Sequence, residues 1–140
     1  MKDTDRDEVA HLGMIQDVIG RMAGNSFMLK GWAVTLVAAL FALASIDTRE
    51  EFAYVALLPV ITFWGLDAYF LRQERLFRKL YDNVRSATVG EVPDPFSMDT
   101  SPFEGEVHSL FATIRTPTLL AFHGAIAIAV IVGIIVLVTQ

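Results

Sequence analysis

The segment from Trp64 to Tyr81, WGLDAYFLRQERLFRKLY, changes from membrane-like sequence to a strongly basic helix. Its first half is apolar apart from Asp67, and its second half carries four bases at helical spacing, namely Arg72, Arg75, Arg78 and Lys79. Neither glycine nor proline interrupts residues 70–85. The sequence therefore predicts one helix that runs out of a lipid bilayer into water.

Two more segments of the chain have the same membrane-like character. A helix needs about 20 mostly apolar residues to cross a bilayer. Three segments of the 140 residues qualify, namely Phe27–Ile46, Phe52–Leu71 and Thr116–Gln140. Only 19% of the chain is charged, below the quarter or so that is usual in soluble domains.

The predicted fold class is an all-α membrane protein with three transmembrane helices. It adds a cytoplasmic amphipathic N-terminal helix and a cytoplasmic extension of the second transmembrane helix. The expected segments are 1–25 (N-terminal helix), 26–46 (first transmembrane helix), 47–51 (external loop), 52–71 (second transmembrane helix), 72–115 (cytoplasmic helix and loop) and 116–140 (third transmembrane helix).

The distribution of Lys and Arg predicts the orientation of these segments. Three crossings place the N-terminus and residues 72–115 on the same side, and that side holds ten of the 11 bases, whereas Arg49 alone lies opposite. Bases accumulate in cytoplasmic loops. We therefore expect a multi-pass protein with a cytoplasmic N-terminus and an external C-terminus.

The N-terminal segment carries a narrow apolar stripe with 3-4-3 spacing, formed by Leu12, Ile15, Ile19 and Met22. Such a stripe is one face of a helix. Gly24 and Asn25 are expected to end this helix, and Ser26 to cap the first transmembrane helix. The stripe either lies on the lipid surface or packs on another cytoplasmic helix, in the same or a neighbouring chain; the second alternative is favoured, and the stripe is assigned to an oligomer interface.

The basic helix has two interpretations. Bases just inside a membrane attract anionic head groups, at about 1 kcal/mol each. Clustered arginines also bind phosphates, which predicts an anion or nucleic-acid site. The residues assigned to this candidate site are Arg72, Arg75, Arg78, Lys79 and Arg85.

The segment between the basic helix and the third crossing contains turn-forming residues together with apolar side chains that would be unfavourable in water. Residues 86–105 are rich in Pro, Gly, Ser, Thr and Asp and are expected to form a loop. The apolar Phe96, Met98 and Phe103 should pack this loop against another part of the protein. Residues 106–115 are expected to form a short helix, with Pro117 near the first turn of the third crossing.

Two polar residues lie inside the apolar segments, and an ionisable residue at such depth is a functional candidate. Asp67 lies about one turn inside the expected boundary, and His123 is in the third crossing. Asp67 is expected to form a structural pair with Arg115 or His123. The alternative is that Asp67 and His123 line a pore mouth or a gate.

Small residues form ridges on two of the transmembrane segments. The third carries Ala121, Ala125, Ala129 and Gly133 at four-residue spacing, and the first carries Thr35, Ala38, Ala42 and Ser45. Small residues let membrane helices approach closely. One ridge is explained by packing within a chain, whereas two indicate contacts between chains and hence a homo-oligomer.

The sequence argues against an enzyme. It contains no cysteine, no phosphate-binding glycine loop and no HExxH or nucleophile-elbow motif. The three histidines are far apart, so we expect neither a metal site nor a cofactor.

Two segments resemble a known family: residues 15–32, IQDVIGRMAGNSFMLKGW, and residues 63–81, FWGLDAYFLRQERLFRKLY. They are similar to small three-crossing bacterial proteins that accompany nucleotidyltransferases in antiphage defence, such as the membrane effector of the Hailong system. The resemblance implies an oligomeric channel of the bacterial inner membrane. We expect the homo-oligomer to be a tetramer.

The resemblance also implies a mode of action. Such a channel kills or arrests the infected cell, and a product of the nucleotidyltransferase partner, oligo-deoxyadenylate single-stranded DNA, holds it shut. No binding residue is carried over from the family. The alternative function is a non-conducting membrane anchor or scaffold that recruits a soluble partner.

Overall fold

The computed structural model describes residues 3–46, 51–87 and 96–139. Within these ranges every regular element is a helix, which confirms the all-α prediction. The elements are α1 (Asp3–Ala44), α2 (Glu51–Val55), α3 (Leu57–Ser86), the 3-10 helix η1 (Ser101–Glu106), α4 (Leu110–Ile114) and α5 (Pro117–Val138).

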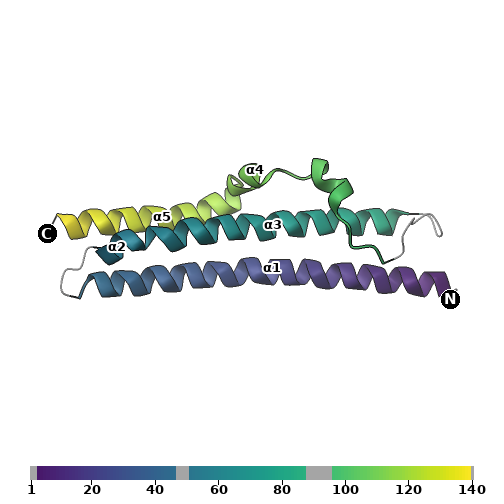
Figure 1. The fold of residues 1–140 in the computed structure, drawn as a ribbon, viewed down its shortest axis with the longest axis horizontal. Helices are drawn as coiled ribbons and strands as arrows, with labels where there is room; N and C mark the ends of the chain where they lie inside the picture. Colours follow the sequence, from purple (N-terminus) through teal and green to yellow (C-terminus); the bar gives the residue numbers. More distant parts are fainter. Residues whose placement is uncertain (1–2, 47–50, 88–95, 140) are drawn as a thin grey trace.

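The long helices α1, α3 and α5 lie side by side in an elongated molecule (Figure 1). α1 and α3 run antiparallel, and α5 runs beside α3 over only part of their length. The 42 residues of α1 span about 63 Å at 1.5 Å per residue, whereas the 22 of α5 span about 33 Å, close to the thickness of a bilayer core. Three helices, one of them formed by α2 with α3, are long and apolar enough to cross a membrane, as predicted.

The difference in length divides the molecule into two halves. The apolar half contains α5, α2, the first part of α3 and residues 27–44 of α1. The hairpin half contains residues 3–25 of α1 and residues 72–86 of α3, with η1 against them (Figure 1).

The expected helix end at Gly24 and Asn25 is wrong, because α1 continues through both residues without a break. A glycine inside a helix costs about 1 kcal/mol, and α1 packs on α3 on both sides of this point. Ser26 caps no helix, since its hydroxyl donates to the side chain of Asp67 instead. The first two predicted segments are therefore one rigid helix.

The helix break in the second crossing follows from Pro59. Proline has no N–H, and its ring clashes with the carbonyl four residues earlier, which here belongs to Val55, the last residue of α2. α3 begins two residues later, at Leu57. The break therefore lies just before α3, and from Leu57 to Ser86 the helix is continuous.

The apolar stripe of the N-terminal segment forms the core of the hairpin half. Ile15 and Ile19 of α1 are buried against Leu80 and Val84 of α3. Partly buried side chains complete this core, namely Leu12, Phe77, Tyr81, Met98 and Phe103. The loop residues Met98 and Phe103 thus pack on the hairpin, as their apolar character predicted.

His11 fastens the same loop to α1. The His11 ring is buried, its Nε2 lies 2.9 Å from the carbonyl oxygen of Ser97, and its centroid is 5.8 Å from that of Phe96. Phe96 has a φ of 72°, which is uncommon for a bulky residue. Next to it, Asp99 accepts hydrogen bonds from the N–H and hydroxyl of Ser101, and these lower the pKa of its carboxyl.

The helix expected over residues 106–115 is shorter than predicted. Residues 101–105, expected to be loop, belong to η1, which also takes Glu106, and α4 covers only Leu110–Ile114. Ser109 is the reason, because its extended backbone and its Oγ, which accepts from the Ala112 N–H, make it the N-cap of α4. Pro117 is the first residue of α5, as expected.

Within the apolar half, Gly133 lets α5 approach α1. A Cβ added to Gly133 would overlap Cε1 of Phe41, whereas one added to Gly124 would meet nothing within 4 Å. Gly133 was assigned to an interface between chains; in the structure it accommodates an aromatic ring of the same chain.

We expect Gly133→Ala to destabilise the packing of α5 on α1 relative to Gly124→Ala. Both substitutions replace glycine within the same helix and gain up to about 1 kcal/mol in helix propensity, but only the first overpacks, at a cost of about 1–3 kcal/mol. Thermal unfolding in detergent, followed by circular dichroism, measures the difference. Phe41→Leu should remove it, and equal stability of the two alanine variants would contradict this role of Gly133.

Candidate functional site

Four polar side chains from all three long helices meet where α3 passes from the apolar half into the hairpin half. The Asp67 carboxylate is fully buried. Its Oδ1 accepts a hydrogen bond from Ser26 Oγ at 2.5 Å, and its Oδ2 lies 2.6 Å from Lys30 Nζ and 2.8 Å from His123 Nε2. We call Ser26, Lys30, Asp67 and His123 the polar cluster.

Helix geometry explains how α1 supplies two members of the cluster. Ser26 and Lys30 are four residues apart and so project from the same face. Lys30 Nζ donates to Ser26 Oγ at 2.9 Å, which closes a three-way contact with Asp67. The Lys30 side chain is 24% exposed although its Nζ contacts the buried carboxylate, so this base is not fully removed from the surface.

Aromatic side chains enclose His123. Trp64, one helical turn before Asp67, stacks on the imidazole with centroids 5.8 Å apart and planes inclined by 12°. Phe122 meets the same ring edge-on at 5.1 Å, and Lys30 Nζ lies 5.9 Å from the centroid of Phe122. These rings exclude water and strengthen the electrostatic contacts inside.

The hydrogen bonds of His123 assign its tautomer. Nε2 faces a carboxylate oxygen and must donate to it, whereas Nδ1 is buried and has no partner in the described part of the chain. A proton on Nδ1 would be a buried donor without an acceptor, which costs more than a bare acceptor nitrogen. The Nε2–H form therefore fits the site. The negative charge of Asp67 is then matched by the positive charge of Lys30.

The packing of α1, α3 and α5 is energetically coupled at the polar cluster. Removing a carboxylate or an ammonium from water costs several kcal/mol, and only the partners on neighbouring helices offset that cost. Trp64 adds a further connection, since its Nε1 donates to the carbonyl of Ile114 at the end of α4. α1, α3, α4 and α5 are thus tied together within about two turns.

The structure brings together the two residues assigned to a pore or gate. Asp67 pairs with His123, one of the two partners considered, whereas Arg115 is exposed and takes no part. Within one chain both side chains are fully buried. Sequence reasoning missed Ser26 and Lys30; the available signal was a lysine inside an otherwise apolar segment.

The five bases of the candidate ligand site do not form one patch. Four have partners in the chain: Arg72 donates to the His108 carbonyl, Arg78 pairs with Glu74, Lys79 with Glu106 and Arg85 with Asp82. Arg75 has no hydrogen bond or ion pair among the described residues. Pairs this exposed contribute about 0–1 kcal/mol, so a ligand can displace them.

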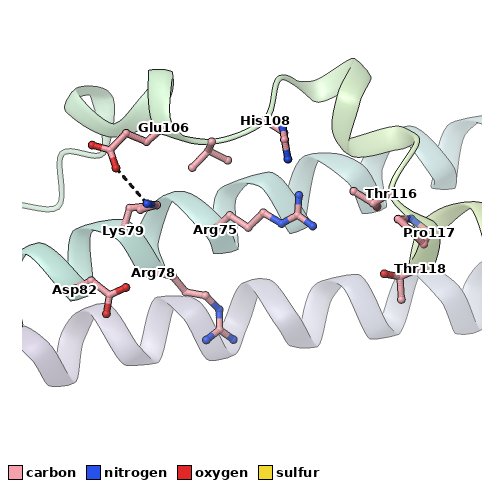
Figure 2. A pocket seen from close by; sticks show the side chains of 10 residues that line it. Arg75, Arg78, Lys79, Asp82, Glu106, His108, Thr116, Pro117 and Thr118 are labelled. Carbon is pink, nitrogen blue, oxygen red and sulfur yellow. Dashed lines mark ion pairs between the residues drawn. The ribbon is translucent and has the colours of Figure 1, made fainter.

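Two grooves border these bases. The boundary groove, of about 530 Å³, lies between α3 and the segment before α5, and is lined by Arg75, Arg78, Lys79, Asp82, residues 106–108 and residues 116–118. Figure 2 shows the Lys79–Glu106 ion pair bridging its two walls. The hairpin groove, of about 240 Å³, lies between α1 and α3 and is lined by Gln16, Ile19, Arg78, Tyr81, Asp82 and Arg85.

The residues assigned to an oligomer interface divide into two sets. Of the N-terminal stripe, Ile15 and Ile19 are already covered by α3 and Leu12 and Met22 are half-buried. On α5, by contrast, Ala121, Ala125 and Ala129 are exposed. Also exposed are Thr35, Ala38 and Ala42 of α1 and Ser45, which follows α1 directly. Most of the small-residue surface is therefore unused within the chain.

Comparison with known protein families, curated proteins and solved structures finds no match to this chain. Among the described residues, no group of three or more His, Asp or Glu is placed to hold a metal ion.

We expect Asp67→Asn and Lys30→Met each to destabilise the protein by about 3–5 kcal/mol, because each leaves the other partner's charge unpaired in a buried site. The double variant should lose less than the sum of the two, since no unpaired charge remains. Thermal unfolding in detergent tests this. The matched control is Asp82→Asn, which breaks an ion pair whose partners are 64% and 65% exposed and should cost at most about 1 kcal/mol. Additive single effects would contradict the coupling.

Proposed function

We propose that this protein is a homo-oligomeric membrane channel that is switched from the cytoplasm. The observation that carries the proposal is the polar cluster, in which one buried carboxylate joins all three long helices. A charged contact of this kind has two discrete states, made and broken. Breaking it exposes polar groups of α1, α3 and α5 to a shared interior, as a water path requires.

The proposed topology follows the distribution of bases. The hairpin half carries most of the Lys and Arg residues, and bases remain on the cytoplasmic side of the inner membrane. The hairpin then projects into the cytoplasm, and Val138 at the end of α5 lies near the external face.

Exposed small residues support assembly from several copies. Lipid provides no hydrophobic drive for helix association, so membrane helices associate where small side chains allow close contact. The exposed alanines of α5 and the exposed small residues of α1 offer two such surfaces per chain. Two different surfaces on one subunit allow a closed ring around an axis.

The continuity of α3 supports control from a distance. Between Asp67 and Arg85 the helix has no break, so a rotation imposed on the hairpin is transmitted to the polar cluster about 27 Å away. α1 is equally continuous between Ile15 and Lys30. Both helices proposed to extend from the membrane, α1 and α3, therefore carry members of the polar cluster.

The resemblance to three-crossing antiphage effectors supplies the biological setting of the proposal. In that setting the channel kills or arrests the infected bacterium, and an oligo-deoxyadenylate made by a nucleotidyltransferase keeps it closed. The hairpin groove suits such a ligand, because Arg78 and Arg85 provide phosphate contacts and Tyr81 a ring for base stacking.

An ion-flux assay on purified protein in liposomes tests conduction. We expect Asp67→Asn to raise the ion flux by at least about tenfold, because losing the charge partner of Lys30 weakens the closed state by more than about 1.4 kcal/mol. Asp17→Asn, an identical substitution at an exposed site in the hairpin half, should leave the flux unchanged.

The same assay addresses the alternative of a non-conducting anchor or scaffold. That alternative is favoured by the complete burial of Asp67 and His123 within one chain, which a static tie between helices also requires. An anchor tolerates Asp67→Asn without any flux. Absence of ion flux in both the wild type and Asp67→Asn would refute the channel proposal.

A binding titration tests the proposed ligand. We expect a short oligo-deoxyadenylate to bind with an affinity that falls steeply with salt, because phosphate contacts release counterions. Arg78→Gln with Arg85→Gln should weaken binding by about tenfold or more, whereas Arg21→Gln, an exposed base of α1 outside the groove, should not. Equal loss in both would show a non-specific charge effect.

A further inference from the structure

The boundary groove lies at the level where the chain enters the membrane. One of its walls is formed by Thr116, Pro117 and Thr118, the residues with which α5 begins. Because α5 is about as long as a bilayer core is thick, its first residues mark the boundary between acyl chains and head groups. The groove therefore opens at the depth of the lipid phosphates.

The charges of the groove fit a single phosphodiester. Three bases and two acids line it, which leaves one net positive charge. Lys79 is matched by Glu106, and Asp82 and Arg78 have partners along α3. Arg75 is the base without a hydrogen bond or ion pair in the described residues, and Figure 2 shows its guanidinium between His108 and Thr116.

Two exposed apolar side chains lie in the sequence between His108 and Thr116, which both line the groove. Phe111 of α4 is 75% exposed and Leu110 is 39% exposed, and both precede the start of α5 by only a few residues. Exposed apolar side chains beside a boundary groove offer contacts to acyl chains. A molecule with one phosphate and two hydrocarbon tails fits both parts of this surface.

We propose that the boundary groove binds the head group of an anionic phospholipid, with Arg75 as its main phosphate contact. The guanidinium offers paired N–H donors that match two phosphate oxygens. Thr118 lies on the same wall of the groove, whereas the Thr116 hydroxyl already donates to the Thr113 carbonyl. A nucleic acid fits this groove less well, because it has no hydrocarbon to contact the exposed Leu110 and Phe111. The proposal requires membrane insertion but not conduction.

Native mass spectrometry of the full chain tests the proposal. The protein is released from nanodiscs that contain equal amounts of phosphatidylglycerol and phosphatidylcholine. We expect each wild-type chain to retain one phosphatidylglycerol in preference to phosphatidylcholine. Arg75→Gln should lower that occupancy by about fivefold, as expected for one base near a membrane surface, and Arg21→Gln should not change it.

A second measurement uses only the wild-type protein and so does not depend on the folding of a variant. A photoactivatable phosphatidylglycerol should crosslink to peptides that contain residues 72–79 and 106–118. Equal retention of both lipids, unchanged occupancy in Arg75→Gln, or crosslinks spread evenly over the apolar half would overturn the proposal.

Competition identifies the source of the phosphate. Inorganic phosphate and a short oligo-deoxyadenylate should leave the lipid in place, because neither has hydrocarbon to lie against Phe111. Displacement by the oligonucleotide would reassign the groove to nucleic acid and refute the lipid site. If neither the wild type nor Asp67→Asn conducts ions but the wild type retains the lipid, only the channel proposal is refuted. The two proposals therefore fail separately.

Discussion

The contact between the Asp67 carboxylate and the Lys30 ammonium determines how the three long helices are arranged. Both charges are stable at that depth only in each other's presence, and Ser26 and His123 occupy the remaining positions around the carboxylate. The pair therefore fixes the register of α1 against α3, and His123 fixes α5 against both. The alignment of three largely apolar helices therefore depends on a few polar atoms.

The helices could be predicted from local sequence, because length and hydropathy alone define a segment that crosses a membrane. Their ends could not. Gly24 and Asn25 have the composition of a helix stop, yet packing of Ile15 and Ile19 on one side and the bond from Ser26 on the other hold the helix together. Ser109, by contrast, begins α4 through its own backbone and hydroxyl, so that a local signal decides where this helix starts.

The candidate site was predictable only in part, for a physical reason. Asp67 and His123 can be identified from the sequence as unusual, because each is a polar residue within an apolar segment. Their partner Lys30 is separated from Asp67 by a whole crossing and a turn, and a sequence does not show which side of a helix will face which neighbour. The bases of α3 illustrate the same limit: their spacing suggests one site, whereas the partners Glu106 and Asp82 and the carbonyl of His108 divide them among separate contacts.

The position of Lys30 has a consequence for biosynthesis. α1 leaves the ribosome before α3, so the insertion machinery handles a lysine in an apolar helix before its carboxylate partner exists. A lysine close to the end of a membrane helix can extend its side chain toward the head groups, which lets α1 enter the bilayer alone. The side chain can turn inward only when Asp67 arrives, so that final docking of the helices waits for the second one to be made.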